Sequence, residues 1–293
     1  MSAIHSHKGH SGHHDDHDKP LPELLQDIAA RERLSRRAAL RRLGGAGFLL
    51  SPLGVMAAVG CGDAVEGESL FSTTPVVTSC TVIPSETGGP YPGDGTNGPN
   101  VLTASGIVRS DMRSSFGSAG SNVAPGVVLT QTLKLVNTNG SCASLANFAI
   151  YLWHCTANGA YSMYSSGVTG ENFLRGVQQT DANGSVTFTT IVPGCYSGRV
   201  THMHFEIYRS LAAAATTGAS ALKTSQLTYD RAALTAFYAA VGSSTYGNSL
   251  SNHNSSSLSS DGIFSDGYST QLATLTGSVA AGYASTLTVG IAA

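Results

Sequence analysis

Residues 80–293 of this 293-residue chain contain short segments of alternating side chains, separated by turns rich in Gly, Asn and Asp. The clearest segment is 200–208, where His202, His204 and Glu206 alternate with three apolar residues. In an extended strand, such residues lie on opposite faces, and the apolar face packs on a core. Many short strands of this kind are typical of a β-sandwich.

Residue patterns also predict the remaining elements. A helical apolar pattern is limited to residues 230–241, and the Ser- and Asn-rich stretch 243–260 is expected to be a loop. The prediction is therefore an all-β chain, one antiparallel β-sandwich with a short helix and long loops appended. The other expected strands are 105–109, 131–137, 148–154, 185–191, 271–277 and 284–291.

The N-terminal residues 1–61 differ chemically from the rest, since they hold 8 of the 16 Lys and Arg residues and 6 of the 10 His residues. Ser35-Arg36-Arg37, followed by a weakly apolar stretch at 43–60, resembles a twin-arginine export signal. Cys61 follows small residues, as in a lipoprotein cleavage box, and simple cleavage nearby is the alternative. The six His residues at 5–17 either bind metal loosely or belong to a discarded leader.

These features divide the chain into three parts. Residues 1–61 are expected to be a His-rich leader and signal peptide, 62–79 a polar linker, and 80–293 the folded domain. The protein is thus expected to be exported, as an extracellular, periplasmic or cell-surface lipoprotein. A formal net charge of -2 excludes a basic nucleic-acid binder. The sequence predicts no membrane-spanning segment after processing, leaves a lipid anchor at Cys61 open, and does not settle the oligomeric state.

Four cysteines follow Cys61, at Cys80, Cys142, Cys155 and Cys195. In an exported chain they suggest one or two disulfides, and full pairing has three possible connectivities. Buried free thiols are the alternative. Their wide spacing argues against a structural zinc site.

The candidate metal ligands lie around His202 and His204, which share one face of a strand and are spaced to hold one metal ion. A constrained loop with two Gly and one Pro presents Tyr196 just before them, and Tyr161 follows the strand that contains Trp153. Phenolate oxygens with neutral imidazoles form a hard, mixed donor set that suits Fe(III) better than Zn(II) or Cu(I).

Four collinear segments resemble the intradiol ring-cleavage dioxygenases of the catechol and protocatechuate type. The similarity covers about residues 80–210. The matching segments are Pro84-Ser-Glu-Thr-Gly-Gly-Pro-Tyr-Pro92, Trp153-His154 with Gly159-x-Tyr161-Ser162, Phe173-Leu-Arg-Gly176 with Gln178, Thr180-Asp181 and Gly184, and Pro193-Gly-x-Tyr196-x-Gly-Arg199-x-x-His202-x-His204.

The resemblance implies a non-haem Fe(III) dioxygenase that uses O2 to cleave a small aromatic diol between its hydroxylated carbons, giving cis,cis-muconate-type diacids. It implies Tyr161, Tyr196, His202 and His204 as metal ligands, with Tyr196 the one displaced by substrate. Arg199 matches the family's arginine beside the substrate ring. Gln226 resembles a pocket glutamine, although an insertion at 211–220 weakens that match.

Two departures and two alternatives remain. Thr156 stands where exported relatives often carry Asp, and Cys195 where Trp or Pro is frequent. One alternative function is a non-enzymatic exported β-sandwich binding module with vestigial metal motifs. The other is a copper oxidase, which would need a third histidine from His154 or His253.

Overall fold

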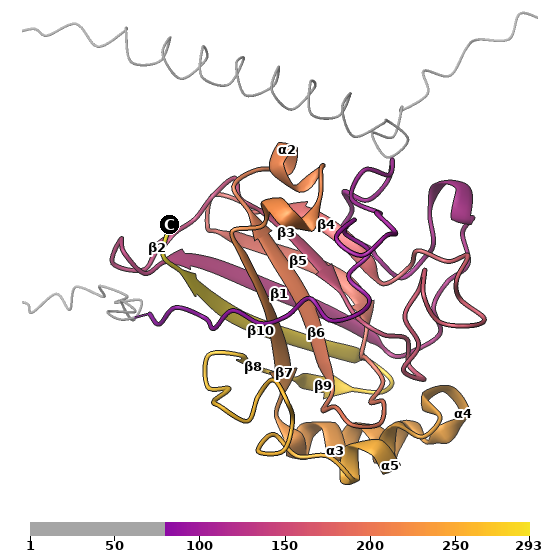
Figure 1. The fold of residues 1–293 in the computed structure, drawn as a ribbon. Coiled ribbons are helices and arrows are strands. Elements are labelled where there is room, and N and C mark those ends of the chain that lie inside the picture. The colour runs from indigo at the N-terminus through magenta and orange to yellow at the C-terminus, as the bar shows by residue number, and fades with distance from the viewer. Residues whose placement is uncertain (1–79) are drawn as a thin grey trace, which may run out of the picture.

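The computed structural model describes residues 80–293, in which two five-stranded sheets face each other (Figure 1). The predicted export signal, the Cys61 box and the linker lie outside the described residues. One sheet contains β1 (Val128–Asn137), β2 (Ala143–Ser144), β5 (Ser185–Ile191), β9 (Thr276–Ser278) and β10 (Gly282–Ile291). The other, in the order β4-β3-β6-β7-β8, contains β3 (Ala149–Trp153), β4 (Arg175–Gln179), β6 (His202–Tyr208), β7 (Lys223–Tyr229) and β8 (Leu272–Ala273).

The core between the sheets is built from the apolar faces that the alternation predicts. Leu133 and Phe188 come from the first sheet, and Ile150, Phe205 and Leu227 come from the second. All five are fully buried. The predicted β-sandwich is confirmed, and five of its strands lie where the alternation placed them, namely β1, β3, β5, β6 and β10.

Both sheets are mixed rather than purely antiparallel. β10 pairs with β1 in parallel, from Leu129 opposite Tyr283 to Asn137 opposite Ile291. β7 and β8 form the second parallel pair. Parallel neighbours need a long connection, and the whole second sheet lies between β1 and β10 in the sequence. Alternation alone carries no information about strand direction, so the sequence did not reveal these pairs.

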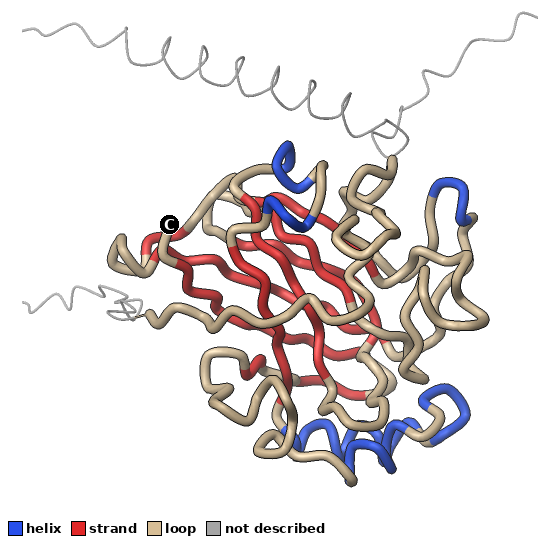
Figure 2. Tube along the Cα trace, viewed as in Figure 1, coloured by secondary structure: helices blue, strands red, loops and turns tan. Residues whose placement is uncertain are grey.

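The helices gather mainly at one end of the sandwich (Figure 2). α3 (Arg231–Val241) confirms the predicted helix, and its N-cap Asp230 accepts a hydrogen bond from Ala233 N. The loop predicted at 243–260 is wrong in part, because α4 (Ser243–Tyr246) and α5 (Ser249–Asn254) form there. Their helical state depends on tertiary contacts such as the Tyr246 ring on Phe237, with ring centroids 5.0 Å apart. The remaining short elements are α2 (Leu211–Ala214), η2 (Gly117–Ala119) and η3 (Gly218–Ser220).

The strand predicted at 105–109 does not form. Gly106 has a φ of +91°, which an extended strand excludes, and a Cβ there would lie 2.9 Å from the Phe116 ring. The segment keeps a single bridge, between Val108 and Val177. The side chains at 105–109 are therefore held by turns packed against β4.

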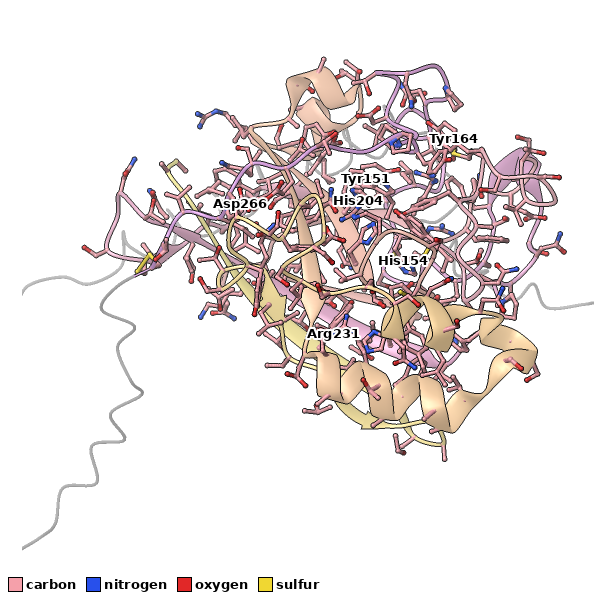
Figure 3. All side chains as sticks on the ribbon, turned by 60° about the horizontal axis from the view of Figure 1, so that its bottom comes forward. Tyr151, His154, Tyr164, His204, Arg231 and Asp266 are labelled. Carbon is pink, nitrogen blue, oxygen red and sulfur yellow. A yellow bond between two sulfur atoms is a disulfide. The ribbon has the colours of Figure 1, made fainter. Side chains whose placement is uncertain are left out.

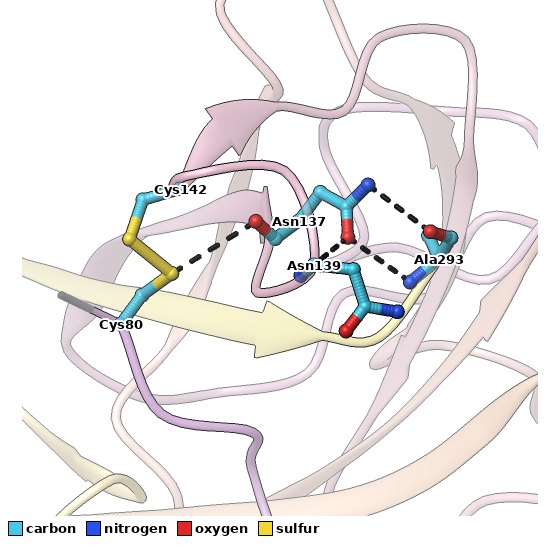
Figure 4. Close-up of a disulfide and its surroundings, with 5 residues drawn as sticks. All are labelled: Cys80, Asn137, Asn139, Cys142 and Ala293. Atoms are coloured by element: carbon cyan, nitrogen blue, oxygen red, sulfur yellow. Dashed lines mark hydrogen bonds between the residues drawn. A yellow bond between two sulfur atoms is a disulfide. The ribbon is translucent and has the colours of Figure 1, made fainter.

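The cysteines form one disulfide, Cys80–Cys142, and Cys155 and Cys195 are buried free thiols. Figure 4 shows the bridge next to Asn137, whose side chain binds both the turn and the C-terminus. Asn137 Oδ1 accepts from Ala293 N at 3.2 Å, and Asn137 Nδ2 donates to Ala293 O at 3.1 Å. The bridge therefore secures the start of the described domain beside the end of the chain. Within residues 80–293, no helix is long and apolar enough to cross a membrane.

Candidate metal centre

His202 and His204 project from the same face of β6 and are almost completely buried, with exposed fractions of 2% and 3%. His202 Nδ1 lies 2.7 Å from the Val200 carbonyl, which can only accept, so Nδ1 carries the hydrogen. The lone pair of His202 is then on Nε2. Burial, aided by the charge of Arg199, lowers the pKa of His202 to about 3 and keeps the ring neutral.

His204 is held between an aromatic ring and a glycine. Its imidazole stacks on Trp153 with centroids 5.0 Å apart and planes 9° apart. On the N-terminal segment, a Cβ at Gly89 would lie 3.2 Å from His204 Cε1. Figure 3 shows His204 in the interior near Tyr151, whose ring stacks on Trp153. Burial, with charged neighbours, lowers the pKa of His204 well below its usual value.

Tyr161 reaches the two histidines from the segment that follows β3. Its hydroxyl lies 3.4 Å from His202 Nε2 and 3.4 Å from His204 Nε2. Gly159 has a φ of +88°, and a Cβ there would lie 3.0 Å from Tyr196 Cβ. The glycine in the first tyrosine segment therefore allows the two tyrosine segments to pack against each other.

Tyr196 approaches from the loop that leads into β6, and its hydroxyl lies 3.1 Å from His202 Nε2. A Cβ at Gly194 would lie 2.3 Å from the Ala157 carbonyl oxygen, so this loop needs glycine there. Tyr196 is half-buried, whereas Tyr161 is 2% exposed. Burial raises the pKa of Tyr196 to about 12 and that of Tyr161 well above its usual value.

The structure thus brings together all four side chains that the sequence singled out as ligands. Two imidazole Nε2 atoms and two phenol oxygens converge within hydrogen-bond distance. In residues 80–293, no group of three or more His, Cys, Asp and Glu side chains is placed to hold a metal ion. A metal bound here therefore depends on the tyrosines. The role of the four residues as ligands stays a prediction.

Arg199 and Gln226, for which the resemblance implies places at the substrate, lie beside this group, and their roles stay predictions. Arg199 Nη2 donates to Gln226 Oε1 at 2.8 Å, and Gln226 Nε2 donates to the Thr87 carbonyl at 2.9 Å. Arg199 Nη1 lies 3.4 Å from His202 Nε2. Gln226 is opposite His204 in the β6–β7 register, which places it despite the insertion that weakened its sequence match.

The comparisons with known proteins agree with this architecture. Residues 103–219 match the protein-family model described as Dioxygenase. The intradiol ring-cleavage dioxygenase from Tetranychus urticae aligns with a TM-score of 0.54 and 23% identity, over 72% of this chain and 95% of that one. A second dioxygenase structure aligns with a TM-score of 0.53 and 24% identity, over 73% and 95%. No curated protein matches the sequence.

The family match covers less than half of the chain, and the two aligned structures share its β-sandwich fold. The matched region contains β1 to β6 and all four candidate ligands. At identities of 23% and 24% the aligned structures show the fold alone.

Among residues 80–293, the copper-oxidase alternative does not find its third histidine. His154, labelled apart from His204 in Figure 3, has Nε2 2.7 Å from Thr190 Oγ1 and Nδ1 2.8 Å from the Cys155 carbonyl. His253 Nε2 lies 2.9 Å from Thr235 Oγ1. Both rings contact groups away from the two tyrosines, so neither completes a three-histidine site.

Sequence reasoning missed Asp261, which holds Arg199 in place. Its Oδ2 accepts hydrogen bonds from Arg199 Nε at 2.9 Å and from Val200 N at 2.8 Å. Burial raises the pKa of Asp261, but these bonds and one from Ile263 N outweigh that effect and lower it overall. Asp261 lies in a Ser-, Asp- and Gly-rich loop, and nothing in that pattern identified it.

Arg175 was recognised only as part of a matching segment. It is 1% exposed and donates to Tyr151 Oη at 2.9 Å, Pro92 O at 2.6 Å and Ser162 Oγ at 3.0 Å. These bonds tie the N-terminal segment and the first tyrosine segment to β4. Arg175 thereby holds in place the N-terminal segment whose Gly89 packs against His204.

The loop that bears Tyr196 and Arg199 is the more exposed side of the candidate centre. Both residues are half-buried, and Ser197 and Gly198 between them are exposed. Tyr91, which is 37% exposed, packs against Tyr161 with centroids 5.0 Å apart. A hollow of about 700 Å³ lined by residues between 105 and 121 shares no residue with the centre. Access is therefore expected at 196–199.

Proposed function

We propose that this protein is a dioxygenase that holds a non-haem Fe(III) ion and cleaves the ring of a catechol between its two hydroxylated carbons with O2. The observation that carries the proposal is the convergence of Tyr161, Tyr196, His202 and His204, with oxygen-to-nitrogen distances of 3.1–3.4 Å. The match of residues 103–219 to the Dioxygenase family model and the fold shared with an intradiol ring-cleavage dioxygenase support ring cleavage in general. The metal and the substrate are our inference.

The donor set fits ferric iron on physical grounds. His202 has its Nδ1 hydrogen engaged with Val200, so its Nε2 lone pair is free for a metal. Both phenols have raised pKa values, so a strong Lewis acid is needed to displace their protons. Two phenolates and two neutral imidazoles leave a net charge of +1 on Fe(III). This balance favours binding of a further anionic ligand, such as a deprotonated diol.

The chemistry that Fe(III) supplies when bound is that of a Lewis acid and template, which holds the diol and makes its ring reactive toward O2. The chain supplies a proton acceptor close by. Tyr196 is the more exposed of the two tyrosines and lies on the loop where the diol enters. Its phenolate oxygen is placed to take up one of the two phenolic protons of the substrate.

Arg199 stabilises negative charge that develops on the ring. Its Nη1 faces the centre, while Nε and Nη2 are engaged by Asp261 and Gln226. A guanidinium fixed in this way needs no reorganisation during the reaction, which is the basis of electrostatic stabilisation. Trp153 and Gly89 hold the His204 ring and limit water on that side.

We further propose that residues 1–61 direct export of the enzyme and that Cys61 is available for lipidation. The Cys80–Cys142 bridge is consistent with an oxidising compartment, since disulfides persist there. Fractionation of cells that express the full chain, with Arg36→Lys and Arg37→Lys variants, tests this proposal. Unchanged export of those variants would contradict it.

Metal analysis of the purified chain tests the central proposal. We expect about one iron per chain, a high-spin ferric resonance and visible absorption from tyrosinate-to-Fe(III) charge transfer. Catechol should cause oxygen uptake and yield a cis,cis-muconate-type diacid. A colourless protein that consumes no oxygen after iron loading would contradict the proposal and favour the binding-module alternative.

Variants of the ligands locate the activity. Tyr196→Phe removes the phenolate oxygen and should lower turnover of catechol at least a hundredfold. Tyr283→Phe is the matched control, because this tyrosine lies on β10 and packs on Phe237 with centroids 5.3 Å apart, far from β6 in the topology. Equal losses in both variants would show that the effect is not specific to the centre.

A further inference from the structure

The Arg199 guanidinium is fixed on two sides by groups from different parts of the chain. Asp261 accepts from Nε at 2.9 Å, and Gln226 accepts from Nη2 at 2.8 Å. The Asp261 side chain is fully buried and that of Arg199 is 20% exposed. Charge-assisted bonds of this kind are about twice as strong as neutral ones. Together the bonds to Asp261 and Gln226 fix the planar guanidinium of Arg199 so that its Nη1 atom faces His202.

Asp261 is in turn held by the backbone on both sides. Its Oδ2 also accepts from Val200 N at 2.8 Å, and its Oδ1 accepts from Ile263 N at 2.9 Å. Val200 lies two residues before His202 on the same segment. The carboxylate therefore links the loop after α5 to the entrance of β6. Its orientation does not depend on the exposed part of the site.

The pairing has an electrostatic consequence. A buried carboxylate 2.9 Å from the guanidinium cancels most of its charge, so Arg199 attracts a distant anion only weakly. Glu86 adds negative charge on the same side, since Gln271 Nε2 donates both to Glu86 Oε1 at 3.2 Å and to the Gln226 carbonyl at 3.0 Å. Burial and the charge of Asp266 raise the pKa of Glu86, against the lowering effects of Gln271 and Arg199.

Arg175, the other buried guanidinium near the centre in the described part of the chain, does not compensate for this charge. Arg175 Nη1 and Nη2 donate to carbonyl oxygens of Pro92, Tyr91 and Ser162 and to Tyr151 Oη. A carboxylate on the substrate ring would therefore enter a region whose nearby cations are already engaged. An uncharged ring does not lose hydration of a carboxylate on entering this region, so it needs no free cation there.

We propose that Asp261 is the positioning residue for Arg199, and that the Asp261–Arg199 pair makes this site prefer uncharged catechols over catechols with a ring carboxylate. This inference rests on the proposed function, because it assigns the substrate class of the same centre. It gives Asp261 a role that the sequence did not suggest.

The test compares two ligands with the same dihydroxylated ring, 3,4-dihydroxybenzoate and its methyl ester, which differ in charge and by one methyl group. Their dissociation constants are measured by calorimetry without oxygen on the iron-loaded full chain, and their turnover is measured with oxygen. We expect the wild-type chain to bind the ester at least tenfold more tightly, because the carboxylate of the acid loses hydration and finds no unpaired cation to offset that loss. Equal binding of the two ligands would overturn the inference while leaving the proposed function intact.

Asp261→Asn removes the charge and keeps a carbonyl acceptor. We expect the preference for the ester to fall roughly tenfold. Turnover of the ester should also fall, because the Arg199 guanidinium loses its fixed orientation. Asp261→Glu keeps the charge and should keep the preference within about twofold. An unchanged preference in a folded Asp261→Asn variant would refute the role of Asp261.

Two further variants complete the design. Asp111→Asn breaks the exposed pair between Asp111 and Arg113, at 2.7 Å, and serves as the matched control with no expected change in preference. If Asp261→Asn does not fold, Glu86→Gln keeps the Arg199 fork and should lower the preference roughly threefold. If Glu86→Gln leaves the preference unchanged, the inference fails. Lack of binding and turnover with every diol would instead overturn the proposed function together with this inference.

Discussion

The two sheets of the sandwich bury the same kind of apolar face toward each other but differ in what covers their outer faces. In β1, buried residues alternate with exposed ones, and Thr130 and Lys134 face solvent. In β6 every residue is buried, including the polar residues His202, His204 and Glu206. The outer face of β1 is an ordinary solvated surface, whereas that of β6 lies beneath a further layer of chain.

That layer has its own apolar cluster. It is formed by β3 residues such as Tyr151 and Trp153 together with loop residues such as Leu102, Ile107 and Tyr161. Burial of polar residues is costly unless they have partners, so a fully buried polar face indicates a specific arrangement. The candidate centre therefore lies in a third layer, which the loops build on one sheet only.

The largest expected effect is at the covered polar face. His204→Ala removes a proposed ligand and should abolish iron-dependent absorption and catechol turnover, because the remaining donors leave the metal poorly held. Visible spectra, iron content and oxygen uptake measure this effect. A variant with full iron and wild-type turnover would show that the covered face of β6 is not a metal site.

The next effect is on the opposite face of the same strand. Phe205 is fully buried in the core between the sheets, so Phe205→Ala should lower the free energy of unfolding by about 3–5 kcal/mol. Urea unfolding followed by circular dichroism measures it. A loss under about 1 kcal/mol would mean that the inter-sheet core does not depend on this face.

The bridge at the edge of the first sheet should have a smaller effect. Cys80 and Cys142 are 62 residues apart in the sequence, and their disulfide should contribute about 2–4 kcal/mol. Cys142→Ser tests this by urea unfolding. Thiol titration of the wild-type chain is the control. Unfolding without reductant should expose two additional thiols, those of Cys155 and Cys195, whose burial keeps them unreactive in the folded state. Four additional thiols would contradict the pairing.

The smallest effect is expected on the open face. The hydroxyls of Thr132 and Thr187 lie 3.0 Å apart across β1 and β5. Thr132→Ala should change the free energy of unfolding by no more than about 0.5 kcal/mol and leave turnover unchanged, because surface pairs of this kind contribute little. A large loss of activity in Thr132→Ala would show that the outer face of β1 also contributes to function, as that of β6 is proposed to do.

The sequence predicted well wherever the pattern was local. Alternation located β5 and β6, and the apolar spacing of Leu234, Phe237 and Tyr238 located α3. It failed at 105–109, where Gly106 takes a positive φ, and at α4 and α5, whose Ser-rich sequences become helical through packing of Tyr246 and its neighbours. In these places contacts between distant segments outweigh local propensity.

In the candidate site too, local sequence identified some residues and only the fold identified others. His202 and His204 are neighbours on one strand face, and Tyr196 and Arg199 stand on the loop that leads to them, so local sequence and family resemblance identified them. Asp261 is 62 residues from Arg199 in the sequence, and only the fold brings it within 2.9 Å.

By itself the sequence determined the strand alternation and the class of fold, because these follow from residue type and short-range spacing, and its family resemblance supplied the candidate ligands. The tertiary structure alone decided the parallel β1–β10 pair, the Cys80–Cys142 bridge and the burial of the polar face of β6. Strand direction, cysteine pairing and burial depend on which remote segments meet. Those meetings are set by packing of the whole chain rather than by any one stretch of it.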